Sequence, residues 1–491
     1  MSQTDVFLKN ETPFTLTIEV EVSGHPLAHE KWGNPRTELK PGERDRVLWF
    51  SRSSGITNNE EFLFSTRVSA QGQTVLLRQK LKGTALDSHM WHTVADEPWF
   101  ADRDTHAVRW SAGDHDIAIG FRAVSTAGAD DLEYVLSADH SRWMGNLKEV
   151  LGPRTLCDLV IPGTHDSGAH EFGPVPVASP DASTAVDILA VVSNVPLLGL
   201  VTAGVVKAWA QTQARDFNQQ LHDGIRYFDL RVACAGEERF DNMRCVHSIW
   251  ATQVAALTAA VKEFIKTRPH ELIILDFNHF YKMTDGALKV LAEGVCADLG
   301  AALVPRAPFL KQVNGVYRLD LSRTLGDIWR AGRQVIVIFD RTAEELQLAP
   351  FADIWPASTI KSSDFLEVNK GDDEDDGAAA RTKLHAAQKL WLDGAEKVWS
   401  ELASHGAGQL YVFQGVISPQ GSYITANILR TGGVQTRCAG FVTAAHYDGM
   451  LKDWAHRRGK GLNITIVDYY HEHHASTGQT YIDVVRSLNK R

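Results

Sequence analysis

The strongest constraint on the fold is the alternation of short apolar strands with helices from residue 156 to the end of the chain. The sequence predicts strands at residues 156–162, 225–232, 245–248, 272–277, 334–339, 410–416 and 463–469. It predicts helices at residues 252–266, 285–299, 378–404, 441–457 and 480–489. A repeat of strand, crossover helix and parallel strand builds either a β/α barrel or a doubly wound sheet.

Polar side chains follow the first of these strands directly. After Pro162 and Gly163 come Thr164, His165 and Asp166. A buried parallel strand delivers reactive side chains to the loop at its C-terminal end, and a histidine beside an aspartate suits acid/base chemistry. A solvated loop histidine is the commoner explanation of a single pair of this kind.

The next strand carries charge on one face. Tyr227, Asp229 and Arg231 alternate with apolar residues and therefore share a face, where a carboxylate and a guanidinium must pair or meet a ligand. A further strand ends in His247. Two histidines at the ends of different barrel strands, with an arginine between them in sequence, are the parts needed to cleave a phosphodiester. Because these residues come from several strand ends, the barrel is favoured over the doubly wound sheet.

The N-terminal part has a different pattern. Residues 1–137 contain apolar, β-branched runs separated by turns, at residues 5–8, 15–22, 46–50, 61–69, 73–80 and 116–124. This pattern predicts an all-β sandwich, followed by a linker at 127–131 and a helix at 140–151. The predicted fold class is therefore α/β: an irregular TIM-type (β/α) barrel at residues 138–491, preceded by a β-sandwich. The opening segment Lys-Asn-Glu-Thr-Pro-Phe-Thr-Leu at 9–16 resembles small lipid-binding β-sandwich proteins of the aegerolysin and actinoporin kind, which makes the β-sandwich a candidate lipid- or membrane-recognition module.

The composition of the chain limits the classes of partner that it can bind. A net charge of -10 argues against nucleic acid, and five scattered cysteines are typical of reduced thiols. The first thirty residues contain no visible signal peptide, so we expect a cytoplasmic protein with peripheral membrane contact. Residues 188–206 are uncharged and interrupt the barrel, which indicates either an interfacial membrane segment at the barrel rim or packing against the β-domain. The acidic run 371–377 can be a solvated surface loop or a cation site, and the solvated loop is favoured.

Several longer motifs carry a family resemblance. Ile-Pro-Gly-Thr-His-Asp-Ser-Gly at 161–168, Gln-Leu-His-Asp-Gly-Ile-Arg-Tyr-Phe-Asp-Leu-Arg-Val at 220–232 and the segment 268–281 resemble the phosphatidylinositol-specific phospholipase C X-domain family. Residues 414–419 and 463–470 fit the C-terminal half of that family. The similarity extends from about Leu147 to the end of the chain.

The resemblance implies a reaction and a set of roles. The 2-hydroxyl of inositol attacks its own phosphodiester and releases diacylglycerol and inositol 1,2-cyclic phosphate. His165 matches the general base and His247 the general acid, while Asp468 matches the carboxylate that orients the base and Asp166 the one that assists the acid. Arg231 stands where calcium-dependent members carry a metal ligand, so we expect no metal and no cofactor.

The resemblance also suggests substrate contacts. Asp229 matches a residue that holds inositol hydroxyls and Arg341 an arginine of the head-group pocket. Asn278 is a further candidate, and its neighbours Asp276 and His279 are tempting for the same reason, although a structural role suits Asp276 equally well. The sequence departs from the family in two places, which leaves the head group open: Gln414-Gly415-Val416-Ile417 replaces an Asp and a Tyr, and Ser248 follows His247 where a glycine is common.

Two other functions remain open at this point. One is a phosphodiesterase acting on another glycerophospholipid or sphingolipid head group, such as a glycerophosphodiesterase or a sphingomyelinase D-like enzyme. Those enzymes carry an acidic metal-binding set, and Arg231 argues against them. The other is a catalytically retired lipid-binding or scaffold protein. The joint presence of His165, Asp166, Arg231, His247 and Asp468 makes this less favoured.

Overall fold

The chain forms two units, one running to His140 and a second from Ser141 through the barrel. The structure, a computed structural model, describes residues 2–12, 15–23, 31–33, 37–40, 43–52, 61–70, 72–84, 87–94, 100–101, 108–112, 115–126, 129–182, 198–340, 353–368, 377–420, 422–424, 451, 454–457, 460, 462–472 and 480–490. Arg341, residues 188–197 and most of the predicted helix 441–457 and of the acidic run 371–377 lie outside these ranges.

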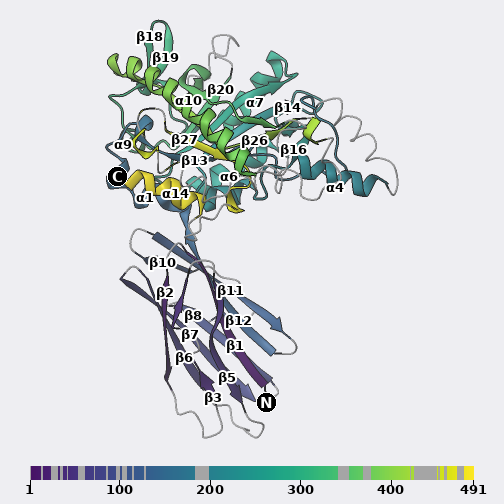
Figure 1. The fold of residues 1–491 in the computed structure, drawn as a ribbon, viewed down its shortest axis with the longest axis vertical. Helices are drawn as coiled ribbons and strands as arrows, with labels where there is room; N and C mark the ends of the chain where they lie inside the picture. Colours follow the sequence, from purple (N-terminus) through teal and green to yellow (C-terminus); the bar gives the residue numbers. More distant parts are fainter. Residues whose placement is uncertain are drawn as a thin grey trace. The chain divides into compact units, whose positions relative to one another are not determined.

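The first unit is built from two six-stranded sheets (purple and blue in Figure 1). One has the order β10 (Val108–Ala112), β11 (His115–Thr126), β12 (Ala129–Asp139), β1 (Ser2–Glu11), β5 (Arg44–Arg52) and β3 (Lys31–Gly33). The other has the order β4 (Glu38–Leu39), β2 (Leu16–Ser23), β6 (Glu61–Ala70), β7 (Gln73–Thr84), β8 (Asp87–Val94) and β9 (Phe100–Ala101). Neighbouring strands are antiparallel, except that β1 and β12 are parallel.

Alternating side chains build the core between these two sheets. In β2, Leu16 and Ile18 are buried while Thr17 and Glu19 are exposed, as expected for a strand with one solvated face. Leu16 and Ile18 belong to one apolar cluster with residues of the other sheet, among them Val6. The predicted all-β sandwich is confirmed. The predicted linker is wrong in its described part, because residues 129–131 begin β12, which pairs with both β11 and β1.

In the described part of the second unit, eight parallel strands follow one another in chain order in the barrel sheet. They are β13 (Ile161–Thr164), β14 (Tyr227–Cys234), β17 (Ile273–Tyr281), β20 (Val335–Phe339), β21 (Ile354–Pro356), β22 (Ile360–Ser362), β25 (Leu410–Gln414) and β27 (Ile464–Val467). Each strand except β21 pairs with the next in this series, and β27 pairs back with β13. Among the described residues the circle is open only between β21 and β22, where no pairing is found. The predicted irregular TIM-type barrel is confirmed.

Helices cover the outside of this barrel (Figure 1). Those with described bounds include α4 (Leu198–Ala210), α5 (Phe217–Asp223), α6 (Val254–Ile265), α7 (Asp285–Leu299), α9 (Leu325–Arg330), α10 (Gly377–Ser404) and α14 (Tyr481–Ser487). Outward residues such as Phe228 and Leu275 pack with helix residues such as Leu257, whereas inward residues such as Ile274 and Ile466 fill the barrel. No helix in the described part of the chain is both long and apolar enough to span a bilayer.

Two predicted strands differ from the structure. Residues Leu156–Asp158 form a 3-10 turn in which Thr155 and Asp158 cap each other, and the strand begins at Ile161. The predicted strand 245–248 is not a barrel strand. It belongs to β15 (Met243–His247), which pairs antiparallel with β14 and with β16 (Ile249–Gln253). His247 therefore reaches the barrel mouth from a hairpin beside β14.

Candidate active site

His165 and Asp468 meet because their strands are paired. Thr164 and Val467, the last residues of β13 and β27, lie opposite each other, so the residues that follow are neighbours. His165 Nδ1 is 2.8 Å from Asp468 Oδ1, and both side chains are buried. Because a carboxylate only accepts, Nδ1 carries the hydrogen and Nε2 is left for proton transfer.

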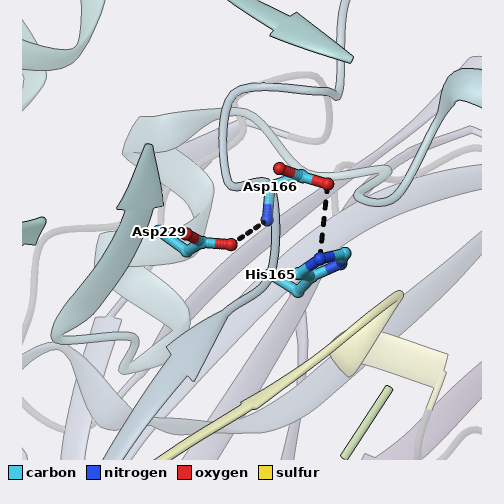
Figure 2. A group of neighbouring side chains, drawn as sticks. All are labelled: His165, Asp166 and Asp229. Atoms are coloured by element: carbon cyan, nitrogen blue, oxygen red, sulfur yellow. Dashed lines mark hydrogen bonds and ion pairs between the residues drawn. The ribbon is translucent and has the colours of Figure 1, made fainter. Parts of the chain in front are cut away.

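Asp166 lies at the centre of the site (Figure 2). One of its oxygens, Oδ2, is 3.4 Å from His165 Nε2 and 3.3 Å from His247 Nε2. The other, Oδ1, is 2.7 Å from Arg231 Nε. Burial raises the pKa of this carboxyl, but Arg231 and, less strongly, the two histidines lower it to about 2. Asp166 is therefore a fixed negative charge between two imidazoles.

Arg231 and the carboxylates act on His165 in opposite directions. Arg231 Nη2 is 3.0 Å from His165 Nε2, and a guanidinium can only donate, so this contact favours the unprotonated nitrogen. Burial also lowers the pKa of His165, whereas Asp166 and Asp468 raise it. The carboxylates outweigh the other two effects, so the pKa of His165 lies above its usual value, at about 9.

His247 is held by a backbone carbonyl. Its Nδ1 is 2.7 Å from the carbonyl oxygen of Ala210, the last residue of α4, so Nδ1 carries a hydrogen and donates it. The other ring nitrogen, Nε2, faces Asp166 and lies 3.3 Å from its Oδ2. The His165 and His247 rings are 6.4 Å apart, centre to centre.

His165, His247 and Asp468 are each followed by a residue in the left-handed backbone region. Asp166 has φ +41°, Ser248 +62° and Tyr469 +45°. Such a conformation costs roughly 1–3 kcal/mol outside glycine and persists only when its surroundings impose it. Here each strained residue donates its N–H: Asp166 to Asp229 Oδ2 (2.9 Å), Ser248 to Asp181 Oδ2 (2.7 Å) and Tyr469 to the Thr212 carbonyl (2.8 Å). These three bonds hold the turns that follow His165, His247 and Asp468.

Asp229 is engaged at both oxygens. Oδ2 accepts the Asp166 N–H (Figure 2), and Oδ1 accepts from the Asn278 amide. His165, Asp166 and Asp229 each offer an atom within 4.8 Å of the others, a group that can hold a metal ion. Arg231 already brings one positive charge to the Asp166 oxygens of this group. The roles of Asp229 and Asn278 toward substrate, and the metal-free site, stay predictions.

Three supporting residues were not expected from the sequence. Gln213 donates from its side-chain amide to the carbonyls of His165 (2.9 Å) and Val467 (3.0 Å), which joins β13 to β27 at the site. Ser167 Oγ accepts the Asp229 N–H at 2.9 Å, and Asp181 holds the turn after His247. The polar run that contains Gln213 directly follows the apolar helix α4, and this change in polarity was the only local signal.

No family model matches the chain. Human PI-PLC X domain-containing protein 2 is 30% identical over 309 residues, which cover 63% of this chain and 86% of that protein. The chain belongs to the family of PI-PLC X domain-containing proteins. The mouse member is 28% identical over 347 residues, with 70% of this chain and 86% of that protein covered.

The family also confirms the resemblance seen in the motifs. Among solved structures, the phosphatidylinositol-specific phospholipase C of Listeria monocytogenes is similar with a TM-score of 0.44 and 16% identity, covering 72% of this chain and 98% of that one. The Staphylococcus aureus enzyme gives a TM-score of 0.42 and 15% identity, with 72% and 98% covered.

Proposed function

We propose that this PI-PLC X domain-containing protein is a phosphodiesterase that cleaves phosphatidylinositol-type lipids to diacylglycerol and inositol 1,2-cyclic phosphate. The observation that carries the proposal is the arrangement of His165 and His247 on either side of the Asp166–Arg231 pair, with Nε2 of each histidine within 3.4 Å of the same carboxylate oxygen. A phosphodiester cleaved by general acid/base catalysis needs one imidazole on each side of the phosphorus.

The proposed reaction uses the lipid as its only reactant. His165 Nε2 removes the proton of the inositol 2-hydroxyl, and the oxygen attacks the phosphorus of the same head group. The bond from phosphorus to the diacylglycerol oxygen breaks, and His247 Nε2 gives its proton to that oxygen. Arg231 neutralises the charge that develops on the non-bridging oxygens, and Asp468 stabilises the imidazolium of His165.

Arg231 is also the reason to propose that no metal is required. A guanidinium presents several donors in a rigid plane that fits phosphoryl oxygens, and it stays charged at any physiological pH. Burial disfavours its charge, but Asp166 and Asp229 raise the pKa of Arg231 above its ordinary value. The charge that stabilises the transition state is then permanent and independent of calcium.

The lipid substrate requires a membrane surface. In this proposal, residues 138–491 are the catalytic barrel, and residues 188–206 at its rim contact lipid. This segment continues into α4, and the carbonyl of Ala210 at the end of α4 accepts a hydrogen bond from His247 Nδ1. Residues 1–137 are the second candidate for membrane recognition.

The test is release of inositol 1,2-cyclic phosphate from phosphatidylinositol vesicles in the presence of a chelator. We expect release by the wild type, a loss of about 10²–10⁴-fold in His247→Ala, and little change in His405→Ala, which removes an exposed histidine after α10. No cyclic product with or without calcium contradicts the proposal.

A further inference from the structure

Strand β17 changes register with β14 beside the catalytic arginine. Asp229 lies opposite Asp276 and Leu230 opposite Phe277, but Arg231 lies opposite His279 rather than Asn278. Ala233 is in turn opposite Tyr281. One extra residue on one strand is a β-bulge, which redirects side chains and is common beside active sites.

The packing shows what this bulge changes. Phe277 and Phe280 both contact Phe339 on the helix side of the sheet. The centre of the Phe339 ring is 5.1 Å from that of Phe277 and 5.3 Å from that of Phe280. In a regular strand, residues three apart point to opposite faces. Since these two share the outer face, Asn278 and His279 are both left on the barrel side.

Hydrogen bonds then select one tautomer of the neutral His279 ring. The Asp229 carboxylate only accepts, so Asn278 turns its amide nitrogen toward it and its carbonyl oxygen toward His279. That oxygen is 2.8 Å from His279 Nδ1, so Nδ1 carries the hydrogen. In the neutral imidazole the other ring nitrogen, Nε2, is then an acceptor, and the side chain is exposed.

Tyr281 lies beside His279, two residues further along β17. Its ring is stacked on His279, with centres 6.0 Å apart and planes inclined by 17°. Burial raises the pKa of Tyr281, Arg231 lowers it, and Asp181, Asp166 and Asp229 raise it further. The register of the two strands puts the stacked pair beside the phosphate position, because Arg231 is the partner of His279 and Ala233 that of Tyr281.

We propose that His279 and Tyr281 form a head-group subsite that selects a cyclic polyol attached to the phosphate bound at Arg231. His279 Nε2 accepts a hydrogen bond from a ring hydroxyl, and the stacked rings cover a C–H face of the polyol. A cationic head group such as choline is disfavoured, because the positively charged Arg231 is the register partner of His279 in the sheet. This inference rests on the proposed phosphodiesterase function.

The test compares two inhibitors of phosphatidylinositol cleavage by the full chain. Myo-inositol occupies the polyol subsite, and inorganic phosphate occupies the Arg231 position. In His279→Ala we expect inhibition by myo-inositol to weaken about tenfold, the loss of one hydrogen bond, and inhibition by phosphate to change less than twofold. His279→Gln, which keeps an acceptor, should recover part of the difference, and His405→Ala is the matched control.

The outcomes separate the subsite from the reaction. Unchanged inhibition by myo-inositol in His279→Ala overturns the subsite, and so does equal weakening by both inhibitors, which indicates general damage to the site. If the wild type releases no cyclic product, the proposed function fails. Calorimetric binding of myo-inositol to wild type and His279→Ala then decides the subsite: equal affinity, or no binding to the wild type, refutes it.

Discussion

Replacement of Asp468 by asparagine isolates the charge behind the proposed base. The side chain keeps its size, and its oxygen can still accept from His165 Nδ1, which lies 2.8 Å from the native carboxylate. What disappears is a buried negative charge. The two charge centres are ~4 Å apart, and an effective dielectric of ~20 gives an interaction of about 4 kcal/mol as an upper bound.

This energy translates into a pKa change of known sign. Burial lowers the pKa of His165, but Asp166 and Asp468 raise it to about 9. Asp468→Asn should therefore lower it by about 1–2 pH units, since part of the charge interaction is offset by solvation. The acidic limb of kcat/KM, which reports the loss of the unprotonated base, should move to lower pH by the same amount.

The maximal rate should fall as well. Asparagine can also turn its amide nitrogen toward Nδ1 and hold the wrong tautomer, which costs up to about 10⁴-fold in a related histidine–aspartate pair. The assay is cyclic inositol phosphate release from phosphatidylinositol vesicles between pH 5 and 10. Asp241→Asn, at an exposed surface pair, is the control. An acidic limb that does not move in Asp468→Asn refutes the base assignment.

Three further predictions concern stability, measured by urea unfolding. In Gly168→Ala the new Cβ would lie 2.3 Å from Cys245 Sγ, so we expect a loss of about 1–3 kcal/mol, and an unchanged midpoint argues against the close approach. Glu271→Gln leaves the buried Arg226 guanidinium without its charged partner at 2.7 Å, which should cost about 3–5 kcal/mol; a loss below 1 kcal/mol contradicts this. Burial raises the pKa of Asp276 to about 7, so the folded state retains a proton that the unfolded state loses near pH 4, and stability falls as the pH rises between these values. Asp276→Asn should abolish this fall, on the order of 2–4 kcal/mol, and a pH dependence equal to that of the wild type refutes it.

Local patterns predicted the elements that repeat a simple rule. The helix predicted at 285–299 is α7, because its apolar residues recur at helical spacing and Thr284 caps its first turn. The strand around Asp229 was found from its two-residue period. By contrast, β21 and β22 have three residues each, too few for any period to appear.

The site was predictable only in part for a related reason. His165 and Asp468 could be paired through the resemblance, although 303 positions separate them. The strained turns could not be anticipated, since the bond that holds Ser248 comes from Asp181 in a distant loop. The hairpin strand that carries His247 could not be distinguished from a barrel strand in the sequence. Antiparallel and parallel strands share the same short apolar pattern.

The measurement that tests the central claim most directly separates the acid from the base by the leaving group. An inositol phosphodiester with an aryl leaving group of low pKa needs no protonation to depart, so the acid becomes dispensable while the base does not. On this substrate the account predicts that His247→Ala recovers to within about tenfold of the wild type and His165→Ala stays impaired by 10² or more. Equal impairment of both variants, or recovery of His165→Ala instead, would contradict the assignment of His165 as base and His247 as acid.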